Sequence, residues 1–153
     1  MLNTCRWIAL IPILLGCGDA EPELVPVRGR IMLQQKPVTE VIVNFAPVGN
    51  TAGSGALGAT DKEGRFELTD VRGQKGAHPG DYKIHLYPAS RPKQNDVPTD
   101  VVSVGGGGIS SIYIDPNNTP LRANVPPAGG HVDVALTSDG KDATTTTSPL
   151  SDQ

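Results

Sequence analysis

Histidine and tyrosine are the residues of this sequence that first suggest chemistry, because imidazole and phenolate groups can bind iron and each type occurs three times. Tyr82 and His85 are separated by an odd number of positions in one alternating segment, so they would lie on opposite faces of a strand. His85 and Tyr87 share a face, but that face alternates with an apolar one and is expected to be solvated. The spacing therefore predicts no metal site and no cofactor.

Other catalytic and ligand-binding motifs are incomplete. The turn at 61–64 has two carboxylates, whereas an EF-hand calcium loop presents oxygen at about five or six positions. The glycine run at 105–108 lacks the lysine and the Ser/Thr that hold a phosphate. The sequence therefore predicts that the protein is not an enzyme. A concave site holding two or more of five polar residues would reverse that prediction: His78, His85, His131, Asp115 and Asp133.

Cys17 is the residue whose modification the sequence predicts most directly. A basic start at Arg6 precedes an apolar run at 7–15, which is about half of the roughly 20 residues that span a bilayer. The segment 14–17, Leu-Leu-Gly-Cys, then resembles a lipobox, in which a small residue before cysteine permits cleavage by a lipoprotein signal peptidase. We therefore expect residues 1–16 to be a signal peptide and Cys17 to become a lipidated N-terminus.

This interpretation of Cys17 has consequences for location and stability. Membrane lipid would be the first partner, and the protein would lie at the bacterial cell membrane or outer membrane. One acyl chain binds a bilayer only marginally, whereas the several chains expected on Cys17 would hold the protein there stably. Residues 17–23 would form the lipidated tether. Cys5 would leave with the signal, so the exported domain would contain no thiol and no disulfide. The alternative is an ordinary secretory signal cut near Ala20, which also predicts export.

Charge and composition narrow the choice of partners and of fold. The formal net charge is −3, and the basic residues are scattered singly, without a stripe that could follow a phosphate backbone. Nucleic acid is therefore not an expected partner. The sequence contains 18 Gly and 14 Pro, more than average usage, which indicates many turns and an all-β fold.

Hydrophobic alternation predicts where the strands lie. Apolar and polar residues alternate in these segments: 25–34, 41–46, 57–59, 66–68, 82–87, 101–104, 121–125 and 132–136. Such short strands, separated by Gly/Pro turns, predict a two-sheet sandwich of seven or eight strands without a helix. This sandwich would form one domain at 24–137. The glycine run at 105–108 is expected to be a flexible turn, and 88–100 a long polar loop. Residues 138–153 carry no apolar pattern and are expected to be a disordered tail.

Several of these segments together resemble a known family. The matching stretches are 27–31, 36–45, 58–66 and 79–84, which are similar to the motifs of carboxypeptidase regulatory-like domains. Segments 115–121 and 129–131 are similar to the C-terminal part of small lipoproteins of this type from planctomycete bacteria. The resemblance covers most of 24–136 and implies a transthyretin-like (prealbumin-like) sandwich. It also implies structural roles for the turn glycines Gly29, Gly64 and Gly80, and for Phe66 and Tyr82 in the core.

Three functions compete on these observations. A membrane-anchored, non-catalytic structural or interaction module of the cell envelope, with a protein or a glycan as its partner, fits the sequence best. A small-ligand or carbohydrate-binding domain is the alternative, with Tyr87 and Tyr113 as its aromatic platforms. A transthyretin-like hydrolase is the third, but the sequence ends without the Tyr-Arg-Gly-Ser segment of hydroxyisourate hydrolase.

Overall fold

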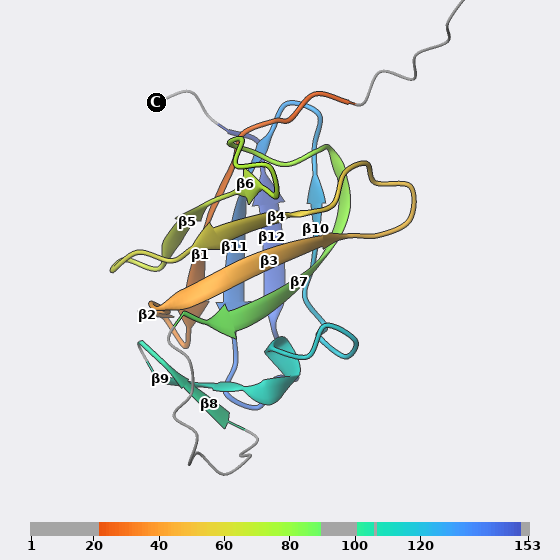
Figure 1. Cartoon of the computed structure of the whole chain (residues 1–153). Coiled ribbons are helices and arrows are strands. Elements are labelled where there is room, and N and C mark those ends of the chain that lie inside the picture. The colour runs from red at the N-terminus through yellow and green to blue at the C-terminus, as the bar shows by residue number, and fades with distance from the viewer. Residues whose placement is uncertain (1–21, 90–100, 106, 151–153) are drawn as a thin grey trace, which may run out of the picture.

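Two β-sheets pack face to face in this protein, for which the computed structural model describes residues 22–89, 101–105 and 107–150 (Figure 1). The expected signal peptide at 1–16, Cys17, most of the tether and the loop at 90–100 lie outside the described residues. Within the described ranges, no helix has the length and apolar character needed to cross a membrane.

The first sheet is built around the parallel pair formed by β1 (Val27–Leu33) and β11 (Gly130–Leu136). Three further strands join it by antiparallel pairing: β2 (Lys36–Pro37) and β5 (Arg65–Glu67) on β1, and β12 (Thr144–Ser148) on β11. Residues of β1 alternate between buried and accessible, as a sheet with one face in a core requires.

The second sheet is antiparallel throughout. Its strand order is β10 (Arg122–Val125), β7 (Gly80–Pro88), β3 (Val41–Pro47), β4 (Ala56–Ala59) and β6 (Thr69–Asp70). Figure 1 shows this sheet lying across the first, with β3 and β7 in front of β1, β11 and β12. A short hairpin of β8 (Val101–Val104) and β9 (Gly107–Ser110) precedes a 3-10 turn, η1 (Ser111–Tyr113), at one end of the sandwich.

The core lies between the two sheets and is filled from both. Phe45 of β3 contacts Phe66 of β5 with ring centroids 6.1 Å apart, and it contacts Tyr82 of β7 at 5.7 Å. Both pairs are tilted, a favourable arrangement for aromatic rings. Most of the inward residues that alternation predicted are buried, among them Ile31, Val43 and Ile84. Leu57 and Ala59 correct that prediction, because β4 turns them outward and buries Ala56 and Gly58 instead. The all-β class and the two-sheet organisation expected from the sequence are confirmed.

Residues 138–150 correct the expectation of a disordered tail. The strand β12 pairs along β11, from Ala135 opposite Thr144 to His131 opposite Ser148. A run of threonines has no apolar pattern, but its β-branched side chains suit a pleated strand, and the edge of β11 supplies the hydrogen bonds. The last three residues, 151–153, lie outside the described part of the chain.

The region after residue 100 also differs from expectation. Gly107 and Gly108 belong to β9, so the glycine run is only partly a turn, and η1 is a short helical turn where none was predicted. Tyr113 of η1 is fully buried, and its hydroxyl lies 3.0 Å from the carbonyl oxygen of Thr137, to which it donates. With the short strands β2 and β6, the described residues form twelve strands, more than the seven or eight predicted.

Candidate functional site

An open depression lies at the end of the sandwich where the chain enters at residue 22. Its volume is about 410 Å³, and six residues from the N-terminal segment and from the loop after β6 line it: Pro22, Glu23, Leu24, Arg72, Gln74 and His78. Figure 1 places this end opposite to η1 and the β8–β9 hairpin. The depression therefore joins the start of the domain to a loop some fifty residues later in the chain.

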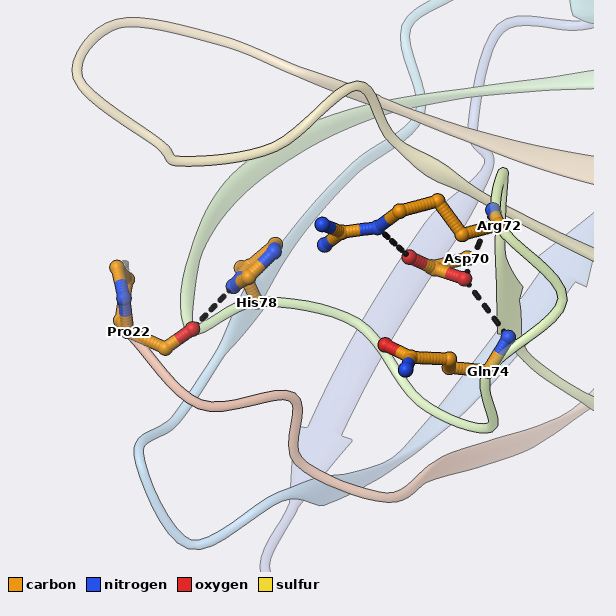
Figure 2. A network of polar contacts seen from close by, with 5 residues as sticks. All are labelled: Pro22, Asp70, Arg72, Gln74 and His78. Carbon is orange, nitrogen blue, oxygen red and sulfur yellow. Dashed lines mark hydrogen bonds and ion pairs between the residues drawn. The ribbon is translucent and has the colours of Figure 1, made fainter. Parts of the chain in front are cut away.

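Asp70 fixes the loop that forms one wall of the depression. Its Oδ1 accepts hydrogen bonds from the backbone N–H groups of Arg72 (2.9 Å) and Gln74 (2.8 Å), and its Oδ2 accepts one from Nε of Arg72 (2.9 Å) (Figure 2). The hydrogen bond from the Arg72 side chain is the largest cause of the lowered pKa of Asp70, and the two backbone bonds lower it further against the opposing effect of burial. Three donors occupy this carboxylate, so it is poorly placed to act as a base.

The same arrangement occurs one hairpin earlier. Asp61 accepts hydrogen bonds from the backbone N–H groups two and four residues later, as Asp70 does. A glycine follows each aspartate at the third position, Gly64 with φ +73° and Gly73 with φ +85°, because L side chains rarely adopt this conformation. The pattern Asp-x-x-Gly therefore identifies two aspartate-closed turns in this chain.

His78 forms the other wall of the depression and holds the N-terminal segment. Its Nδ1 donates a hydrogen bond to the carbonyl oxygen of Pro22, which fixes the proton on that nitrogen because a carbonyl can only accept (Figure 2). Its Nε2 is buried and has no hydrogen-bond partner within the described ranges. A Cβ added to Gly53 would lie 2.4 Å from Cδ2 of His78, so this glycine lets the loop close over the ring.

These contacts make the depression a structural clasp. The imidazole of His78 is occupied on Nδ1 by the backbone, and the Asp70 carboxylate is occupied by its own loop. The hydroxyl of Tyr82 donates a hydrogen bond of 2.8 Å to the carbonyl oxygen of His78, which ties the clasp to the core. The arrangement holds Pro22 against the sandwich and does not pair a nucleophile with a base.

His85 corrects the prediction that its face of the strand is solvated. The residue is only 4% exposed, and Nε2 lies 2.8 Å from the hydroxyl oxygen of Tyr87, with the two rings edge to face at 4.9 Å. Burial lowers the pKa of His85, and the charge of Lys83 lowers it further. Alternation correctly placed His85 and Tyr87 on one face, opposite to Tyr82, but it did not indicate that His85 would be covered.

The remaining predicted polar residues lie elsewhere. His131 and Asp133 are two residues apart on β11, with Nε2 and Oδ1 separated by 3.1 Å on an accessible face. Asp115 closes a turn by accepting from the backbone N–H of Asn117 at 2.8 Å. Of the five residues proposed as a test for an enzyme, the depression holds only His78. Across the part of the chain that the structure describes, no three His, Cys, Asp or Glu side chains group as metal ligands.

The predicted glycines differ in their surroundings. Gly64 and Gly80 have positive φ angles, +73° and +145°, and both lie at or beside turns. Gly29 is not in a turn, which corrects that part of the prediction: it lies within β1, where a Cβ would come 2.1 Å from the carbonyl oxygen of Val132 and 2.4 Å from Cζ of Phe66. Phe66 therefore occupies the space that a side chain at Gly29 would need.

Comparisons with protein-family models, with curated proteins and with solved structures found no match. The resemblance to carboxypeptidase regulatory-like domains thus stays a prediction from the motifs themselves. Among the residues of the clasp, the sequence analysis singled out only His78, and it did so as a catalytic candidate. The repeated Asp-x-x-Gly pattern at 61–64 and 70–73 was the available signal for the loop.

Proposed function

We propose that the protein is a lipid-anchored lipoprotein of the bacterial cell envelope, and that its sandwich is a non-catalytic interaction module for an envelope protein or glycan. The observation that carries the proposal is the segment 14–17, which places a cysteine after a short apolar run and a small residue. Acyl chains on Cys17 would act as the membrane anchor, and no cofactor is needed for this role.

The arrangement of the domain supports this proposal in two ways. The polar residues that could have formed an active site are dispersed over two strands, β7 and β11, and two loops, and the clasp residues His78 and Asp70 are bonded to backbone groups. The clasp also holds the chain at Pro22, five residues after Cys17 in sequence. A domain attached to a membrane through its N-terminus needs its first residues to be fixed to the sandwich in this way. A carboxypeptidase regulatory-like, transthyretin-like domain is the family that we propose for it, on the motifs around Gly29, Gly64 and Tyr82.

Replacement of the anchor residue tests the proposal. We expect Cys17→Ser to abolish incorporation of labelled palmitate and to leave the chain unprocessed, because the thiol is the acyl acceptor. Cys5→Ser is the matched control, since it removes the other cysteine of the sequence within the predicted signal and should leave labelling unchanged. Equal palmitate labelling of Cys17→Ser and of the parent chain would overturn the lipoprotein assignment.

A glycan-binding face is a second candidate, favoured by one observation. Tyr87 is 38% exposed on the outer face of the second sheet, opposite Ile42, and Leu57 lies one strand further on the same face, opposite Asn44. An exposed aromatic ring among apolar neighbours can stack on a sugar. Tyr113, the other predicted platform, is buried and cannot do so. We expect Tyr87→Ala to lose binding to purified peptidoglycan sacculi while Tyr87→Phe keeps it; equal binding by both variants would refute this candidate.

A further inference from the structure

The distance from the proposed anchor to the sandwich is limited by the chain itself. Five peptide units separate Cys17 from Pro22, and each adds at most about 3.6 Å, so the two residues are within roughly 18 Å of each other. Pro22 does not move freely beyond that, because His78 holds its carbonyl oxygen. An anchor on Cys17 therefore keeps the clasp end of the sandwich close to the membrane surface.

The part of this end with the most accessible apolar side chain is the loop at 70–75, which we call the anchor-side loop. Val71, at its tip, is 58% exposed, the highest exposure among the large hydrophobic residues of the described ranges. The ammonium group of Lys75 is 3.1 Å from Oε2 of Glu67, in an accessible pair whose lysine side chain is 79% exposed. Asp70 holds the loop in one conformation through the backbone of Arg72 and Gln74, so Val71 is displayed on a rigid support.

We infer that the anchor-side loop is the membrane-facing surface of this domain, with Val71 in the headgroup region and Lys75 beside lipid phosphates. The inference rests on the proposed lipidation of Cys17 and goes beyond it by fixing the orientation of the sandwich. An apolar side chain next to cations is the chemistry that an anionic bilayer surface binds, and an accessible ion pair such as Lys75 with Glu67 exchanges partners at little cost. Arg72 keeps its bond to Asp70 in this arrangement.

Acidic and basic side chains are both present at the clasp end of the sandwich, and their balance determines which lipids the loop can contact. Glu23 lines the depression and Glu67 lies beside Lys75, so acidic groups offset the cations at this end. Contact therefore depends on Val71 and on the position of Lys75 rather than on net charge, and the loop is expected to reach the headgroups of both neutral and anionic vesicles. The opposite end, with η1 and the β8–β9 hairpin, then points away from the membrane and is free for a partner (Figure 1).

Site-specific labelling of the lipidated chain tests this orientation. Because acylation would consume the thiol of Cys17 and processing would remove Cys5, a cysteine introduced into the domain is the only free thiol. Val71→Cys is labelled with an environment-sensitive fluorophore, and Asn117→Cys, an exposed position near η1, is the matched control. The proteins are reconstituted in vesicles of phosphatidylcholine and phosphatidylglycerol that contain a brominated phosphatidylcholine as quencher.

We expect the label at 71 to be quenched several-fold more strongly than the label at 117, and Lys75→Glu to reduce that quenching in the anionic vesicles. Equal quenching at the two positions, with both proteins floating with the vesicles, would overturn the orientation and leave the lipoprotein proposal intact. Failure of both proteins to float with the vesicles would overturn the lipid anchor itself. The two results separate the inference from the proposal on which it rests.

Discussion

Gly29→Ala is the substitution whose effect follows most directly from the geometry of the sandwich. An alanine Cβ at this position would lie 2.1 Å from the carbonyl oxygen of Val132 and 2.4 Å from Cζ of Phe66, whereas real Cβ atoms essentially never approach closer than 3.0 Å. Val132 is the partner of Gly29 on β11, and Phe66 is its partner on β5. Relief of the clash therefore requires both neighbours of the central strand to move.

The expected cost of this substitution is about 3 kcal/mol, the upper part of the usual range for overpacking, because one of the clashing atoms belongs to the backbone of a sheet. For a domain of this size about 1 kcal/mol corresponds to roughly 4 °C, so the midpoint of thermal unfolding should fall by about 12 °C. Gly49→Ala is the control: it adds the same methyl group at φ +63° with no atom within 4 Å, and should cost only about 1 kcal/mol of backbone strain.

Thermal unfolding of the processed chain, followed by circular dichroism, measures both variants. The predicted order is parent, then Gly49→Ala, then Gly29→Ala as the least stable. If Gly29→Ala were as stable as Gly49→Ala, Phe66 would not cover β1 at this point, and the register of β1 with β5 and β11 would be wrong.

Three further predictions follow from the clasp, the buried histidine and the last strand. The lowered pKa of His85 means that the unfolded chain binds this proton more readily, so the free energy of unfolding should decline as pH falls below about 6.5. His85→Gln should remove that decline when denaturation is measured as a function of pH. Carboxylates with a lowered pKa, such as Asp70, add stability above about pH 4 that is lost on further acidification. His78→Phe keeps a ring but loses the bond to Pro22, at about 1 kcal/mol, and should speed proteolysis before Leu24; an unchanged rate would contradict the clasp. Truncation after Ser138 removes β12 and should destabilise the domain by about 2–4 kcal/mol in urea unfolding, whereas a disordered tail would leave it unchanged.

The strands that could be predicted from the sequence are those in which apolar, buried residues alternate with polar, accessible ones. Tyr82, Ile84 and Leu86 alternate with polar residues, and the resulting strand has its apolar face in the core. The strand β12 was missed because threonines show no apolar periodicity, and its formation depends on a free edge of β11 that a local pattern cannot reveal.

The candidate site was less predictable than the fold, because its contacts are distant in sequence. Alternation assigns a face to His85 but does not say which other segment covers that face. Tyr113 has no apolar period around it, and its burial depends on a distant contact with Thr137. The clasp joins His78 to Pro22, which are 56 residues apart, and no local motif encodes such a pair. The loop at 70–74 was within reach, since it repeats the spacing of 61–65.

The N-terminal residue of the protein extracted from its own membranes tests the central claim most directly. Mass spectrometry of the N-terminal peptide is predicted to find a chain that begins at Cys17 and carries a diacylglyceryl group on the sulfur. A chain that begins near Ala20, or one in which Cys17 is unmodified, would contradict the anchored-lipoprotein account.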